Sequence, residues 1–124
     1  MNDPIRFVIL FDVARVSPNQ RLNRWERNRR NQAGRLNAFN EWAHAGRPQV
    51  DCPVVVDVVI RRARALDHDN AVASLKPCLD GIFKDALTPD DSPRWLTLGE
   101  VRQETAKEWK GKEHVEFIVR PREE

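Results

Sequence analysis

The chain has few cysteines and lacks the segments that direct a protein into or across a membrane. Cys52 and Cys78 are the only two cysteines among 124 residues, and they form no Cys-x-x-Cys pair. We read them as small buried hydrophobic side chains in a reducing compartment. No apolar run approaches the ~20 residues of a transmembrane helix, and residues 1–4 are not the charged start of a signal peptide. The sequence therefore predicts a soluble, cytoplasmic protein without membrane contact.

Internal repeats, linkers and low-complexity segments are also absent, which predicts a single domain over residues 1–124. A chain of this size buries about two-thirds of its unfolded surface, so it needs no disulfide or structural metal to fold. The three histidines, His44, His68 and His114, have no zinc-ligand spacing. These absences exclude disulfide-stapled and zinc-stabilised small proteins.

Arginine is abundant, and it is concentrated in the first half. Residues 15–64 hold eleven arginines, no lysine and four acidic residues, a net charge of +7, whereas residues 65–124 hold nine basic and thirteen acidic residues, a net charge of −4. Arginine binds phosphate in a bidentate fashion that lysine cannot. A solvated charged helix is the alternative, but the clustering favours nucleic acid. The arginines predicted to bind DNA are Arg21, Arg24, Arg27, Arg29, Arg30, Arg61, Arg62 and Arg64.

Four segments are rich in branched and aromatic residues and predict strands. They span residues 5–11, 53–62, 95–103 and 115–120. Both faces of the first are largely apolar, which predicts a central place in the sheet. The last two are joined around Gly111, which fits a hairpin turn.

Two segments show helical periodicity. Residues 35–45 predict a firm helix, while 20–34 read as loop or frayed helix because their middle has no apolar period. Residues 70–87 predict a second amphipathic helix, and Pro77 predicts that it bends near residue 73 or begins near residue 75. The fold class is therefore α/β (α+β): a small mixed four-stranded sheet with two helices packed on it, in the order β-α-β-α-β-β.

Acidic residues gather directly after the second predicted strand, beginning with Asp67 and Asp69. In extended chain, residues two apart point the same way, and their Cα atoms lie ~6.6 Å apart. Two ionised carboxylates so close repel each other unless a cation lies between them. Hard divalent cations such as Mg²⁺ or Mn²⁺ take oxygen ligands, so this pair is a candidate metal site. The alternative is an Asx-rich N-cap of the following helix.

The same stretch continues with a lysine and further carboxylates. Lys76 either stabilises a phosphate as a mobile cation or forms an i,i+4 ion pair with Asp80, worth ~0.2–0.5 kcal/mol. Asp90 and Asp91 precede Ser92, and either could supply a third carboxylate. Only one of the two is expected to face the site, because adjacent side chains diverge.

This stretch resembles the RusA family of Holliday junction resolvases, which are common in bacterial prophages. The resemblance is carried by Asp67-x-Asp69-Asn70, by Lys76 and Asp80, by Asp90-Asp91-Ser92, and by Ser17-Pro18-Asn19, which is similar to the family's N-terminal loop. The likeness in element order extends over the whole chain. It implies a Mg²⁺-dependent endodeoxyribonuclease that resolves four-way DNA junctions by paired symmetric nicks as a homodimer. It also implies Asp67, Asp69 and Asp91 as metal ligands and catalytic residues, with Lys76 as the catalytic lysine. In the family pattern the lysine follows sooner, where this chain has Ala73.

A non-catalytic nucleic-acid-binding regulator with the same fold is the alternative function. The intact carboxylates favour the nuclease, since a pure binder has no need to concentrate negative charge near DNA. A homodimer would match the near two-fold symmetry of a four-way junction. Its interface could use Phe39 and Trp42 or, preferably, the strand near residues 95–98. Trp25, placed amid arginines and asparagines, is a candidate for contact with DNA, although tryptophan is more often a core residue.

Overall fold

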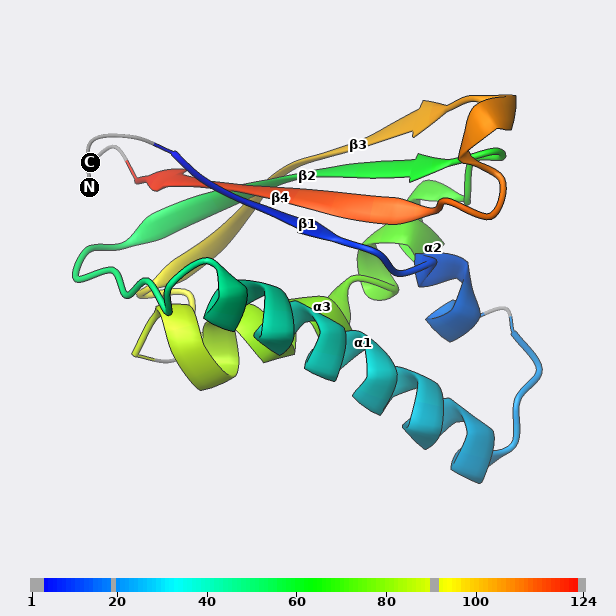
Figure 1. The fold of residues 1–124 in the computed structure, drawn as a ribbon, viewed down its shortest axis with the longest axis horizontal. Helices are drawn as coiled ribbons and strands as arrows, with labels where there is room; N and C mark the ends of the chain where they lie inside the picture. Colours follow the sequence, from blue (N-terminus) through cyan, green and yellow to red (C-terminus); the bar gives the residue numbers. More distant parts are fainter. Residues whose placement is uncertain (1–3, 19, 90–91, 123–124) are drawn as a thin grey trace.

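The computed structural model describes residues 4–18, 20–89 and 92–122. One mixed sheet has the strand order β1-β4-β2-β3, and the helices cover one of its two faces (Figure 1). The strands are β1 Ile5–Ile9, β2 Val54–Arg62, β3 Leu96–Thr105 and β4 His114–Pro121. The predicted α+β class, with helices packed on a mixed four-stranded sheet, is confirmed.

The core lies between the sheet and the helices. Strand side chains alternate between faces, and the inward-facing residues of the two central strands are all buried. In β2 and β4 they are Val54, Val56, Val58, Ile60, Val115, Phe117 and Val119. This apolar alternation explains why β2 and β4 occupy the middle of the sheet.

The connection between β3 and β4 is not the predicted hairpin. Strand β2 lies between them, parallel to β3 and antiparallel to β4. The chain after β3, which includes the short 3-10 helix Lys107–Trp109, therefore passes the end of β2 before β4 begins. Gly111 does adopt a turn conformation, with a φ of 78°. Turn chemistry fixes where a chain reverses, but it does not decide which strand becomes the neighbour.

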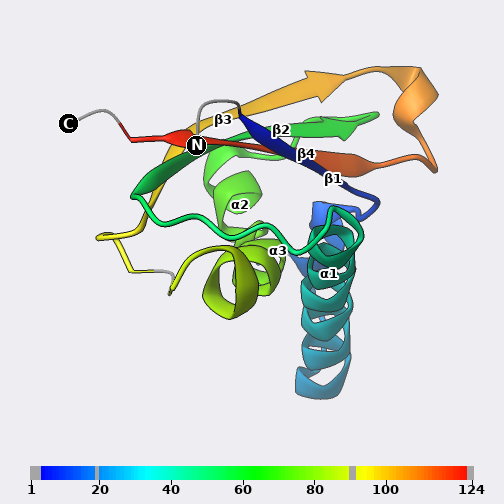
Figure 2. The same ribbon diagram turned by 60° about the vertical axis from the view of Figure 1, so that its left-hand side comes forward.

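Strand β1 lies at the edge of the sheet, so its predicted central place is wrong. It pairs only with β4, and Val8 and Leu10 are exposed. Apolar residues on both faces of a strand predict that both faces are covered. Within the described part of the chain, no helix covers the outer face of the sheet (Figure 2), so part of that apolar surface remains exposed.

Helix α1 spans Arg24–His44 without interruption, so the prediction of a loop or frayed helix over residues 20–34 is wrong for most of that range. The Asn23 side chain caps the helix by accepting a hydrogen bond from the Glu26 N–H at 2.8 Å. Glu26 also pairs with Arg29 and Arg30, one turn ahead. These local interactions replace the apolar periodicity that the segment lacks.

The second helical segment is broken as Pro77 predicted. It comprises α2 His68–Ala73, α3 Lys76–Leu79 and a π-helical turn, η2, Asp80–Leu87. Pro77 occupies the first turn of α3, where its missing N–H leaves no helical hydrogen bond unmade. A Cβ on Gly81 would lie 2.2 Å from the Arg35 carbonyl oxygen, so glycine allows η2 to approach α1 closely.

Cys78 lies in the contact between α3 and α1. Its thiol is completely buried and contacts the Gly34 carbonyl oxygen at 3.7 Å. Burial raises the pKa of Cys78 to about 12.

No helix in the described part of the chain has the length and apolar composition needed to cross a bilayer.

Candidate functional site

Asp67 and Asp69 lie where the chain leaves the end of β2 and enters α2. Asp67 occupies the N-cap position of α2, but its side chain accepts no capping hydrogen bond. Asp69 lies in the first turn of the helix, so the extended-chain geometry predicted for the pair is wrong; both side chains are exposed. Within the described chain, neither carboxylate forms a hydrogen bond or an ion pair. The capping role that was the alternative to metal binding is therefore not performed by either side chain.

The backbone before this acidic pair is held by a side chain of β3. The Leu66 N–H donates to Gln103 Oε1 at 2.8 Å, and Gln103 Nε2 donates to the Leu66 carbonyl oxygen at 2.9 Å. This double hydrogen bond fixes the segment immediately before Asp67 to the sheet. No sequence motif indicates this role for Gln103, because its hydrogen-bond partner is the backbone of Leu66.

The third predicted carboxylate, Asp91, and its neighbour Asp90 lie outside the described residues. Ser92 accepts a hydrogen bond from the Trp95 N–H, and the Trp95 carbonyl oxygen accepts one from the Val54 N–H. Ser92 is thereby placed beside the start of β2, whereas Asp67 follows its end. Among the residues that are described, no three His, Cys, Asp or Glu side chains come together in a way that could hold a metal.

Lys76 lines a hollow of about 250 Å³ between α1 and the α2–α3 segment. Its Nζ lies 3.4 Å from Asp80 Oδ1, so the predicted i,i+4 contact is present, although it is long and exposed. The remaining lining residues are Val16, Arg27, Asn31, Gln32, Arg35, Ala73 and Pro77. Three cationic side chains against one carboxylate make this hollow suitable for an anionic ligand. Asp69 precedes Ala73 by four residues, so it lies on the same helical face as the hollow.

A second basic hollow, of about 630 Å³, lies at the end of β2. It is lined by Arg62, Ala63, Arg64, Lys107, Lys110 and Glu113. Arg64 was predicted to bind DNA, but the two lysines were not. They come from the connection that passes the end of β2, so only the true strand order brings them beside Arg64.

The predicted DNA-binding arginines of the first half differ in whether their guanidinium groups already form hydrogen bonds within the protein. Arg21 and Arg24 are exposed, whereas Arg27 Nη2 donates to the Gln20 carbonyl oxygen at 2.7 Å. Arg29 and Arg30 share the carboxylate of Glu26, and these hydrogen bonds, that of Arg30 above all, hold the pKa of Glu26 below its usual value. The paired guanidiniums keep further N–H groups that can reach phosphate.

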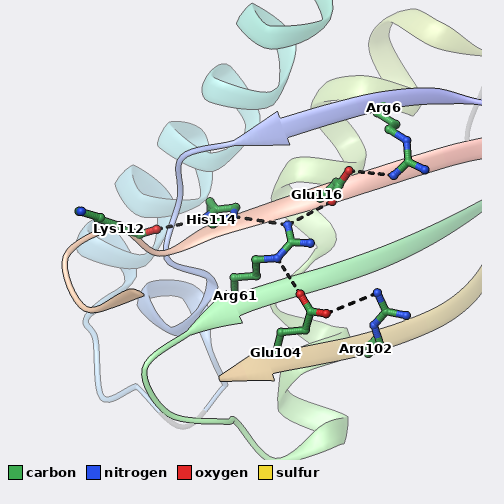
Figure 3. A network of polar contacts seen from close by, with 7 residues as sticks. All are labelled: Arg6, Arg61, Arg102, Glu104, Lys112, His114 and Glu116. Carbon is green, nitrogen blue, oxygen red and sulfur yellow. Dashed lines mark hydrogen bonds and ion pairs between the residues drawn. The ribbon is translucent and has the colours of Figure 1, made fainter. Parts of the chain in front are cut away.

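Arg61 lies on the open face of the sheet, inside a network of charges (Figure 3). Its Nε donates to Glu104 at 2.8 Å and its Nη1 to Glu116 at 3.1 Å. Arg6 and Arg102 pair with the same two carboxylates. Arg61 is therefore largely neutralised by its neighbours, and it is a weaker candidate for phosphate binding than Arg64.

Two further arginines near β2 are also paired with carboxylates. Arg62 Nε donates to Asp12 Oδ1 at 2.8 Å, and Arg120 Nε donates to Asp57 Oδ2 at 2.9 Å. Partial burial disfavours the charged form of Asp57, but the hydrogen bonds from Arg120 and the Glu100 N–H outweigh it and hold its pKa below the usual value. The open face thus carries largely compensated charge, whereas basic residues outnumber acidic ones in the linings of the two hollows.

No known family model matches the chain. No curated protein matches it either. The functional inference therefore depends on the fold and on the chemistry of these residues.

Proposed function

We propose that this protein is a Mg²⁺-dependent endodeoxyribonuclease that resolves four-way DNA junctions as a homodimer. The observation that carries the proposal is the pair of exposed carboxylates at the start of α2. Asp67 and Asp69 have no partner in the described chain. Residues 62–64, which precede them, line one basic hollow, and Ala73 and Lys76, which follow them, line the other. The RusA-like motifs at these positions support the same assignment.

The carboxylate pair fits a hard divalent cation. Two ionised, unpaired carboxylates two residues apart are unfavourable without a counter-charge, and Mg²⁺ binds a few carboxylates while retaining several waters. Asp67 and Asp69 would hold the ion. The RusA resemblance implies Asp91 as a third ligand, but the adjacent Ser92 lies at the opposite end of β2 from Asp67, so the proposed site rests on the first two carboxylates. When bound, Mg²⁺ supplies Lewis acidity and charge neutralisation for phosphodiester hydrolysis, and Mn²⁺ can substitute.

The surrounding residues have separate tasks in this proposal. Lys76, whose contact with Asp80 is long, would stabilise the negative charge that develops on the phosphate. Arg27 and Arg35 line the same hollow and would hold the neighbouring backbone. Arg64, with its two lysine neighbours, would hold a duplex arm at the end of β2.

A homodimer supplies the second active site that paired nicking requires. Of the two predicted interfaces, the one using Trp42 is disfavoured, because this side chain is buried and its Nε1 donates to the Pro48 carbonyl oxygen at 2.7 Å. Strand β3 is an edge strand, with Leu96 and Leu98 only partly buried. We therefore place the proposed interface at β3, where unpaired backbone groups favour strand addition.

The test is cleavage of synthetic four-way, duplex and single-stranded DNA with and without Mg²⁺. Asp67→Asn and Asp69→Asn should each abolish cleavage and leave junction binding intact or tighter, because each removes a negative charge near phosphate. Loss of cleavage in Asp91→Asn would support the third ligand that the RusA resemblance implies. Asp51→Asn makes the same charge change at an exposed site near the start of β2 and should keep full activity. Full activity in Asp69→Asn would refute the site assignment.

The alternative is a DNA-binding regulator without nuclease activity. It is favoured by the position of Ser92 at the opposite end of β2 from Asp67, which leaves only two carboxylates together among the described residues. Tight junction binding by the wild-type protein, with no cleavage in Mg²⁺ or Mn²⁺, would establish this alternative.

A further inference from the structure

The first half of α1 extends beyond the part of the helix that packs on the protein. The buried residues of α1 are Gly34, Ala38 and Trp42, and all three lie in its second half. In both ribbon views the end that begins at Arg24 lies farthest from the sheet (Figures 1 and 2). The projecting segment, residues 24–33, contains no buried residue and contributes little to the core.

Trp25 is the most conspicuous side chain of this projecting segment. It is 74% exposed, whereas Trp42 on the same helix is buried. Exposing a tryptophan leaves a large apolar area in water, which folding alone does not favour. Its exposure leaves the indole ring accessible to a ligand.

The residues around Trp25 form a shallow, open hollow of about 870 Å³ on the end of α1. It is lined by Asn23, Arg24, Trp25, Asn28, Arg29 and Gln32, and none of these is acidic. Trp25, Asn28, Arg29 and Gln32 follow the i, i+3, i+4, i+7 spacing of one helical face. The hollow thus offers one aromatic plane, two guanidiniums and three carboxamides.

This combination matches the chemistry of a nucleotide whose base is unpaired. An indole face stacks on any base, guanidiniums bind phosphate, and carboxamides donate to and accept from base edges. A second copy of the chain is a poorer occupant, because a symmetric contact would bring two sets of arginines together. The charge of the hollow therefore selects a polyanion over this protein itself.

We propose that Trp25 is the stacking platform for a nucleobase that is unstacked at the branch of the DNA substrate. The proposal rests on the proposed function. Gln32 lines this hollow and also the hollow of Lys76, so the two adjoin on α1. A base held on Trp25 would therefore fix the register of the strand whose phosphates enter the Lys76 hollow. Trp25 would act as a specificity residue, without taking part in the chemistry.

The experiment compares Trp25→Ala, Trp25→Phe and the control Leu36→Ala, which removes another exposed side chain of α1 (58% exposed). Each variant is titrated in EDTA with single-stranded oligothymidine, with plain duplex, and with a four-way junction carrying 2-aminopurine either at the branch or within an arm. Trp25→Ala should weaken single-strand binding about ten- to a hundredfold and leave the salt dependence of binding unchanged, since no charge is removed.

The same variant should abolish the 2-aminopurine signal change at the branch and leave duplex affinity unchanged. Trp25→Phe should retain most of the binding, and Leu36→Ala should behave as wild type. Wild-type behaviour of Trp25→Ala would overturn the inference while junction cleavage by the wild-type protein still supports the nuclease. A protein that binds single strands through Trp25 but cleaves nothing would overturn the nuclease and support the stacking site. Loss of dimerisation in Trp25→Ala, without any change in 2-aminopurine signal, would assign the hollow to a second copy and overturn the inference.

Discussion

Replacing Gly81 by alanine should destabilise the fold, because the added Cβ would collide with the backbone of α1, which cannot shift as a side chain can. The added Cβ would lie 2.2 Å from the Arg35 carbonyl oxygen and 3.1 Å from the Ala38 Cβ, so η2 must move away from α1. Overpacking of this kind costs ~1–3 kcal/mol. Alanine recovers about 0.5–1 kcal/mol through its higher helix propensity. We expect a net loss of about 1–2 kcal/mol, with each kcal/mol lowering Tm by roughly 3–5 °C for a chain of this length.

Gly34→Ala is the matched comparison, because it makes the same chemical change on the other side of the same helix contact. Its Cβ would lie 3.0 Å from the Phe11 ring and 3.1 Å from the Pro77 Cβ, which are side-chain atoms. The Phe11 ring can shift by a few tenths of an ångström, so the propensity gain should largely offset the crowding. Denaturant unfolding of both variants measures the difference. A loss in Gly81→Ala equal to or smaller than that in Gly34→Ala would refute the close-approach explanation.

Three other outcomes can be measured independently. Because the folded-state pKa of Asp57 is lowered, its carboxylate stabilises the fold above the unfolded pKa of about 4, and that contribution disappears as pH falls through the folded pKa. The stability gap between wild type and Asp57→Asn in urea should therefore shrink in acid; a widening gap would contradict the ion pair with Arg120. Alanine at both Lys107 and Lys110 should flatten the dependence of log K on log salt by about 0.9 per lost phosphate contact, whereas Lys84→Ala, at an exposed site outside both hollows, should not. Equilibrium sedimentation should show a dimer at micromolar concentration, and a monomer that nicks both strands in one binding event would refute the symmetric mechanism.

The strands were predictable because runs of branched and aromatic residues favour buried extended chain. In β2, every residue from Val54 to Ile60 except Asp57 is apolar, and this β-branched run predicts a buried strand although it does not mark a single covered face. The start of α1 was predictable in principle but was missed. The Asn23 cap and the Glu26–Arg30 pair are local in sequence, and they stabilise a helix start that has no apolar periodicity.

The order of the strands was not predictable by the same means. Gly111 marks a reversal, but whether β4 then pairs with β3 or passes the end of β2 depends on contacts distant in sequence. The basic hollow at Lys107 and Lys110 was missed for that reason. The acidic pair could be located from sequence because Asp67 and Asp69 are only two residues apart along the chain. Whether Asp91 joins them stays a prediction.

Because Cys78 is buried, the rate at which its thiol reacts reports how often the contact between α1 and α3 opens. With a pKa of about 12, about one thiol in 100,000 is ionised at pH 7, and the sulfur has no path to reagent while the helices stay packed. Cys52 is only partly buried and lies outside that contact. A maleimide should therefore label the chain in two phases, with Cys52 first and Cys78 at a rate set by local unfolding. The slow phase gives the free energy of separating the two helical segments that enclose the Lys76 hollow, without any change to the sequence.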